Sequence, residues 1–198
     1  MHNLPSATEV NKLLPKKLIY AKFSMNTAQR EKLDKDISRI TISNEISPQR
    51  LSISAGENIK SFFLIHIALK RKDFDPKNII MISKLIPQNI LFVLEYENEV
   101  KLCVNHIKLM QSEWMNKGDC TVKLDGLNLD SVWENIIISI GSISLQDDNT
   151  LDEQIAVDER KLKLQKEIDK LTRQAKTEKQ PNKKFELIKK INELKGEL

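Results

Sequence analysis

The stretch "NEVK" holds the pair of residues in this chain that comes nearest to a catalytic pattern. Glu99 and Lys101 are two positions apart, so on a β-strand they would share one face. A metal-dependent nuclease of the restriction type places acidic ligands and a lysine at the ends of adjacent strands, and Asp73 and Asp75 lie upstream as possible further ligands. However, Glu99 falls at a predicted hairpin turn and Asp75 at a predicted helix start, where a carboxylate caps the first turn. The pattern leaves both a nuclease site and a structural role open.

The histidines and cysteines give no stronger sign of chemistry. His66 and His106 lie in predicted strands without a carboxylate or cysteine partner at ligand spacing, so we expect structural histidines rather than metal ligands. Cys103 and Cys120 lack companions at the spacing of a zinc site. Glycine-rich phosphate loops, dinucleotide fingerprints and serine nucleophile elbows are absent from the sequence. We therefore predict no catalytic residue, no metal site and no cofactor.

The C-terminal stretch "EKQPNKKFELIKKINELKGEL" is rich in lysine. Residues 160–190 contain 12 basic and 4 acidic side chains, a local charge of +8. Such a surface can attract phosphate groups or an acidic protein, and it can equally be the solvated face of a helix. The candidate nucleic-acid contacts are Lys183, Lys184, Lys189 and Lys190.

The apolar residues of the same tail alternate spacings of four and three, which is the pattern of a seam between helices. The seam positions are Val157, Lys161, Leu164, Ile168, Leu171 and Ala175, then Leu187, Ile191, Leu194 and Leu198, with Phe185 and Ile188 widening the second face. The break at "QPN" predicts an antiparallel helical hairpin. Two short helices bury little apolar area, so the hairpin should also pack on the first domain, a second copy or a partner. The expected partner contacts are Leu164, Ile168, Leu171, Leu187, Ile191 and Leu194.

Trp114 is the other candidate partner contact. It lies in the predicted loop "QSEWMNKGD" beside Met110 and Met115. An exposed cluster of tryptophan and methionine is typical of an interface anchor. The alternative is an indole ring folded over the edge of the sheet.

The spacing of apolar residues changes along the chain between that of helices and that of strands, and it predicts the elements that position these residues. Ser6 and Glu9 have the spacing of a capping box, which predicts a helix through Leu14. Further helices are predicted at 16–23, at 27–40 with Thr27 as N-cap, at 75–87 with Asp75 as N-cap, and at 127–140 with Asp130 as N-cap. Alternating apolar residues predict strands at 39–47, 51–53, 61–70 and 120–124, and a hairpin over 89–107 that turns at residues 97–99.

Strands joined by short turns favour antiparallel pairing. The expected fold is α+β: a mixed, mainly antiparallel sheet flanked by helices, followed by a C-terminal antiparallel helical hairpin. The predicted domains are residues 1–145 and 146–198, joined through the polar stretch 141–150. With 40% hydrophobic residues the chain can fill a core, and it lacks a signal peptide or an apolar run of transmembrane length. We expect a cytoplasmic protein that does not bind membranes.

Three separated stretches together resemble the bacterial and archaeal domain of unknown function 4391. They are "LPSATEVNKLLPKK", then "LFVLEYENEVKLCV" with "LDGLNLDSVWENI", and "EKQPNKKFELIKKINELK". The resemblance implies a setting rather than a reaction, because such proteins tend to be encoded beside helicases and DNA methyltransferases in restriction-like or phage-defence clusters.

We therefore expect a non-enzymatic accessory subunit of a DNA-acting complex, docked through its C-terminal helices on a large partner such as a helicase. A direct nucleic-acid-binding module and a metal-dependent nuclease are the alternatives. A homo-oligomer remains possible.

Overall fold

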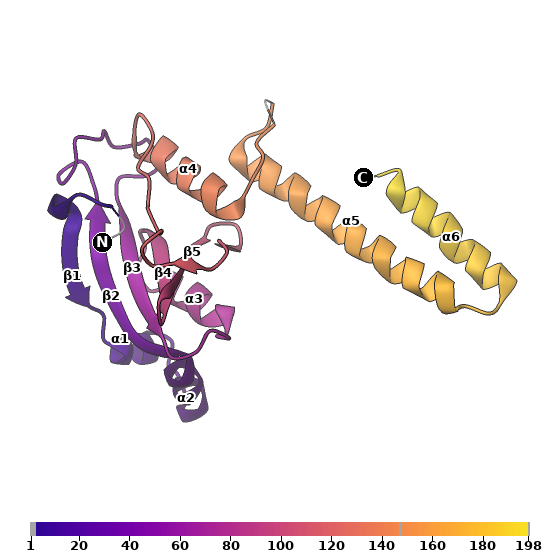
Figure 1. Cartoon of the computed structure of the whole chain (residues 1–198), viewed down its shortest axis with the longest axis horizontal. Coiled ribbons are helices and arrows are strands. Elements are labelled where there is room, and N and C mark those ends of the chain that lie inside the picture. The colour runs from indigo at the N-terminus through magenta and orange to yellow at the C-terminus, as the bar shows by residue number, and fades with distance from the viewer. Residues whose placement is uncertain (1–2, 147, 198) are drawn as a thin grey trace. The chain divides into compact units, whose positions relative to one another are not determined.

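A sheet with the strand order β1-β2-β3-β4-β5-β6 forms the centre of the first part of the chain, and β7 also pairs with β5. The computed structural model (Figure 1) describes residues 3–146 and 148–197. The strands are β1 (Glu9–Leu13), β2 (Ile37–Ile46), β3 (Phe62–Leu69), β4 (Asn89–Tyr96), β5 (Glu99–Asn105), β6 (Leu109–Gln111) and β7 (Met115–Asn116). Among the named strands of the described residues, β3 and β4 pair in parallel and the other pairs are antiparallel.

Helices cover both faces of this sheet. On one face, a buried core gathers side chains from β2 to β5 with those of α1 (Lys16–Lys22), α2 (Thr27–Asp36) and α3 (Pro76–Ser83). On the other face, α4 (Leu129–Gly141) packs Trp133 against Phe62 with ring centroids 5.0 Å apart. In β3, Phe62 and Leu64 on one face and Ile65 and Ile67 on the other are all fully buried. The fold is therefore the mixed, mainly antiparallel α+β arrangement that the sequence predicts.

Several local predictions are confirmed. Asp75 caps α3 by accepting a hydrogen bond from the backbone N–H of Lys77 (3.0 Å), with Pro76 in the first helical position. The β4–β5 hairpin forms and turns at Glu97–Asn98, whereas Glu99, which was predicted in the turn, is the first residue of β5. The predicted apolar side of α4 is buried, and its members are Val132, Trp133, Ile136, Ile137 and Ile140.

The predicted helix from Ser6 to Leu14 is wrong. Ser6–Thr8 forms one 3₁₀ turn, and Glu9–Leu13 is the edge strand β1, paired antiparallel with β2. A helix this short is marginal without tertiary contacts, whereas the edge of β2 supplies backbone partners. The Thr8 hydroxyl also accepts a hydrogen bond from the buried Asn44 amide at 2.8 Å, which holds the entry to the strand.

Two predicted helix caps are wrong by one or two residues. Asn26, not Thr27, caps α2 in a reciprocal capping box with Gln29 (both hydrogen bonds 2.9 Å). Asn128, not Asp130, caps α4 by accepting from the N–H of Ser131 at 3.0 Å. In both cases an asparagine with extended backbone precedes the predicted cap and is free to fold its side chain onto the first turn.

Asp130 instead fastens a distant loop to the start of α4. Its carboxylate accepts hydrogen bonds from the N–H groups of Ile59 (2.7 Å), Asn58 (3.2 Å) and Glu57 (2.7 Å). These three donors, Ile59 foremost, hold the pKa of the Asp130 carboxyl below its usual range. We call Gly56–Ile59 with Asp130 the loop clamp.

The loop clamp should give the first unit a measurable acid sensitivity. Because the pKa of Asp130 is lowered on folding, its stabilisation is present at neutral pH and is lost as the pH falls through the folded pKa. We expect the urea midpoint to decline from about pH 5 downward more steeply in the wild type than in Asp130→Asn. Tryptophan fluorescence measures this, and equal slopes in the two proteins would contradict the assignment.

Two predicted strands lack a ladder. Residues 120–124 are in no strand, and near Leu51 and Ile53 the only described pairing is the isolated parallel bridge Ser54–Asn128. Pairing needs a free neighbouring edge, which alternation in the sequence cannot supply. His106, predicted within a strand, lies in the turn between β5 and β6. Among the described residues, no helix is long and apolar enough to cross a membrane.

The second compact unit spans residues 144–198, after a first unit of 1–143. It contains α5 (Leu151–Thr177) and α6 (Pro181–Lys195), which pack together as the predicted pair. Thr150 caps α5 in a capping box with Glu153. The ion pairs Arg160–Glu197 (3.5 Å) and Lys190–Glu167 (3.3 Å) fit an antiparallel register, because later residues of α6 face earlier residues of α5.

Candidate functional site

The heptad seam closes within the chain. Ile168, Leu171, Ala175 and Ile191 are buried together, and Leu187 and Leu194 pack against them. Leu164 is half-buried on the same stripe, and Lys161 is exposed. The structure thus places five of the six predicted partner contacts, all but Leu164, between α5 and α6, where they hold the two helices together. Leu198, the last seam position, lies outside the described residues.

The apolar surface that the hairpin leaves open is formed by other residues. Phe185 is 69% exposed, Ile188 is 42% exposed and, on α5, Leu162 is 53% exposed. Phe185 and Ile188 are three residues apart, so they share one side of α6. The sequence pattern assigned both to the seam because they widen its stripe. Only the fit of α6 on α5 distinguishes the covered positions from the open ones.

Basic side chains are also exposed on both helices of the hairpin. Lys183, Lys184, Lys189 and Lys190 are all exposed, and Lys190 pairs with Glu167 across the seam. On α5, a further exposed row recurs at spacings of three and four, away from the buried stripe: Lys163, Lys166, Lys170 and Arg173. That spacing in the sequence could have identified this row. The hairpin thus combines an open apolar patch with a positive surface.

Trp114 is held on the sheet of the first unit. Its half-buried ring packs against the core beneath α1 to α3. The ammonium groups of Lys72 and Lys101 lie 5.2 and 5.3 Å from its ring centroid, within the range of a cation–π contact. Part of the indole is therefore already used, and its role as a partner contact stays a prediction.

The candidate nuclease pair joins the same cluster. The Glu99 carboxylate accepts a hydrogen bond from Lys72 at 2.5 Å, while Lys101 lies over the Trp114 ring. Asp75 caps α3 and pairs with Lys32 at 2.7 Å. Within residues 3–146 and 148–197, no three His, Cys, Asp or Glu side chains form a group that could hold a metal ion.

A second charged cluster links the parallel strands β3 and β4 near the carboxyl end of β4. Glu95 on β4 contacts His66 Nε2 on β3 at 2.7 Å and Lys117 Nζ at 2.8 Å. Burial favours a higher pKa for the Glu95 carboxyl, but the hydrogen bonds from Lys117 and His66 outweigh it and keep the pKa below its usual range. Because two basic groups occupy the Glu95 carboxylate, it links neighbouring segments of the fold and is not free to act as a base. His66 thus has a charged side-chain partner that its sequence neighbours do not reveal.

The cysteines are not activated nucleophiles. Cys103 and Cys120 are free and buried. Burial raises the pKa of the Cys103 thiol to about 12 and also raises the pKa of Cys120. A thiol with a raised pKa forms little thiolate at neutral pH, so both act as small apolar residues of the core.

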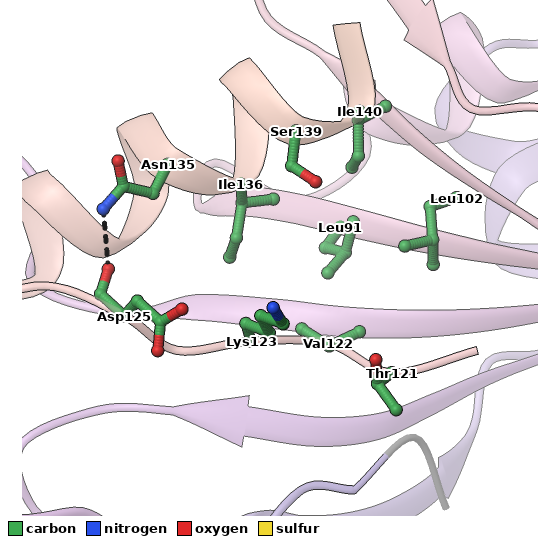
Figure 2. Close-up of a pocket in the computed structure, with 10 residues that line it drawn as sticks. All are labelled: Leu91, Leu102, Thr121, Val122, Lys123, Asp125, Asn135, Ile136, Ser139 and Ile140. Atoms are coloured by element: carbon green, nitrogen blue, oxygen red, sulfur yellow. Dashed lines mark hydrogen bonds between the residues drawn. The ribbon is translucent and has the colours of Figure 1, made fainter. Parts of the chain in front are cut away.

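A small cleft lies between α4 and the sheet (Figure 2). Its volume is about 260 Å³. Leu91 and Leu102 line it from the sheet, and Ile136 and Ile140 from α4. The segment Thr121–Asp125 forms the remaining wall, tied to α4 by a hydrogen bond from Asn135 Nδ2 to the backbone oxygen of Asp125 at 2.8 Å.

These features describe an α+β domain that carries a basic helical hairpin with an open apolar patch. The chain matches the family described as "Domain of unknown function (DUF4391)" over residues 3–198, and it belongs to that family. No curated protein and no solved structure matches it.

Proposed function

We propose that this protein is a non-enzymatic accessory subunit of a DNA-acting, helicase-containing complex of the restriction-like or phage-defence type. It docks on a large protein partner through the outer surface of α5 and α6. The family resemblance supports the setting, and the free buried cysteines are compatible with a cytoplasmic one. The observation that supports docking is the exposure of Phe185 and Ile188 on one side of α6, with Leu162 also exposed on α5.

The size of the hairpin core makes an outside partner useful. Only four described side chains are buried in the seam. A core this small gives a helical pair little stability by itself. Burying Phe185 and Ile188 under a partner surface adds roughly 1.5–3 kcal/mol for each fully covered side chain, so docking and hairpin stability should rise together.

Charge indicates what kind of partner fits. The +8 of residues 160–190 repels a second copy of the same hairpin and attracts an acidic rim. The partner surface should therefore be an apolar groove bordered by aspartate and glutamate.

The first test is a change of Phe185 and Ile188 to glutamate. The tagged full-length chain is used to pull down the partner from its host. The amount of partner recovered with the double variant should be at least tenfold lower than with the wild type, because two carboxylates cannot enter an apolar groove. Ile107→Glu is the matched control, since Ile107 is 54% exposed in the first unit. Mass spectrometry identifies the partner, and circular dichroism checks that both variants keep their helices.

Recovery of the same partner by wild type and double variant would contradict docking through this patch. Nuclease treatment before the pull-down distinguishes the second candidate, direct DNA binding by Lys183, Lys184, Lys189 and Lys190, which are exposed. If recovery is lost with nuclease, DNA links the proteins. Affinity for DNA should then fall by about 0.9 log units per log unit of salt for each phosphate contacted.

A further inference from the structure

The segment Thr121–Asp125 has the pattern of a strand but pairs with no strand among the described residues. Val122 is buried and Leu124 half-buried, while Thr121, Lys123 and Asp125 are exposed. This alternation is typical of a strand that lies with one face on a core. Figure 2 shows the segment drawn out along the cleft below α4.

Its backbone hydrogen-bonding groups are largely without protein partners. Among the residues that the structure describes, no backbone N–H of the segment donates to another backbone group. The one described bond to its backbone is the Asn135 side chain on the Asp125 oxygen. Extended backbone with free N–H and C=O groups is a template for another extended chain.

A hollow lies beside this segment, in addition to the cleft below α4. It has a volume of about 640 Å³ and lies among Thr121–Asp125, Leu51–Ile53 and Asn3–Pro5. At one end, the chain of Leu51–Ile53 is fastened to the start of α4 by the Ser54–Asn128 bridge, with the Leu129 N–H donating to the Ser54 oxygen at 3.0 Å. The hollow, which we call the strand slot, is therefore an open gap between two segments that are joined near one end.

We propose that the strand slot accepts an extended peptide of a protein partner, which adds as a strand to Thr121–Asp125. An extended peptide backbone satisfies successive N–H and C=O groups in a single register, which scattered side chains cannot do. Five paired residues extend over about 17 Å. The cleft below α4 has less than half the volume and is lined by Ile136 and Ile140, so it has room for a side chain rather than for a strand.

The chemistry of the slot defines the peptide. Leu4, Leu51, Ile53 and Leu124 contribute apolar side chains to the lining, so alternate residues of the peptide should be apolar. This site lies wholly in the first unit and does not depend on the proposed docking of α5 and α6. Failure of either proposal leaves the other standing.

Hydrogen exchange of the full-length protein is the first test. The amides of residues 121–125 should exchange close to the rate of an unstructured peptide, while those of the neighbouring strand β4 are protected. Strong protection of residues 121–125 in the free protein would overturn the proposal, because the segment would already have a partner.

A phage-displayed library of random octapeptides, selected on the full-length protein, is the second test. Adjacent N–H groups of an extended chain point to opposite edges, so either Lys123 or Leu124 donates into the slot. Proline has no N–H group, so one of the variants Lys123→Pro and Leu124→Pro should bind the selected peptides at least tenfold more weakly. Lys123→Ala and Leu124→Ala keep the N–H group and should retain binding.

The bound peptide should also protect residues 121–125 from exchange. No selected peptide, or peptides that bind both proline variants as well as the alanine variants do, would overturn the proposal. If a proline variant fails to fold, hydrogen exchange of the wild type with and without peptide still shows whether the peptide pairs with residues 121–125.

Discussion

Replacing Asp36 with alanine should lower the free energy of unfolding of the first unit by about 3 kcal/mol. Asp36 ends α2 and is fully buried. Its carboxylate accepts hydrogen bonds from Arg71 Nε (2.5 Å), Asn78 Nδ2 (2.8 Å) and the N–H of Asp75 (2.9 Å). Alanine would leave the buried Asn78 amide without its acceptor and release the loop between β3 and α3.

Urea unfolding followed by tryptophan fluorescence measures this loss, because Trp114 and Trp133 both belong to the first unit. Asp73→Ala is the matched control, since Asp73 is an exposed aspartate of the same loop. It should change the stability by less than about 0.5 kcal/mol. If the two variants were equally stable, Asp36 would not hold this corner of the fold.

Replacing Gly56 with alanine should destabilise the loop clamp by about 3 kcal/mol, at the upper end of overpacking effects. Gly56 is buried, and a Cβ there would lie 2.1 Å from Asp130 Oδ1 and 2.7 Å from the Asp130 backbone nitrogen. The carboxylate could rotate away, but the backbone nitrogen cannot, so the loop must shift. All three hydrogen bonds to Asp130 would then lengthen.

Gly118→Ala is the control for this substitution, because a Cβ at Gly118 meets nothing within 4 Å. It should be neutral or slightly stabilising, since alanine restricts the unfolded chain more than glycine does. Thermal unfolding of the two variants makes the comparison. The Gly56 variant should also bind strand-slot peptides more weakly, because the clamp fastens the loop that follows Leu51–Ile53.

If both proposals hold, the protein has two separate means of assembly. The hairpin presents an apolar patch with a basic border, and the first unit presents backbone hydrogen-bonding groups in the strand slot. A long folded surface of a partner suits the apolar patch of the hairpin, and a flexible extended segment suits the strand slot. Both could engage one large partner, and the combined affinity would then exceed either alone.

Patterns within a few residues predicted a large share of this fold. The heptad spacing predicted α5, α6 and their seam, and Asp75 with Pro76 predicted the start of α3. The turn residues 97–99 between two apolar runs predicted the β4–β5 hairpin, and the turn itself is Glu97–Asn98. Each of these patterns is local, because a period, a helix cap or a turn is set by residues a few positions apart, so the amino acids themselves contain the information.

Long-range contacts decided the rest. Residues 9–13 became a strand because the edge of β2 was available, whereas residues 120–124 pair with no strand in the described part of the chain. The sequence predicted Asp130 only as a helix cap and gave no role to Asp36, because the partners of both carboxylates lie more than 30 residues away. Likewise, the sequence pattern placed Phe185 and Ile188 on a widened face beside the seam position Ile191, and only the packing of α6 on α5 left the first two open. Periodicity determines which residues share a face, whereas the neighbour that covers the face is a property of the tertiary structure.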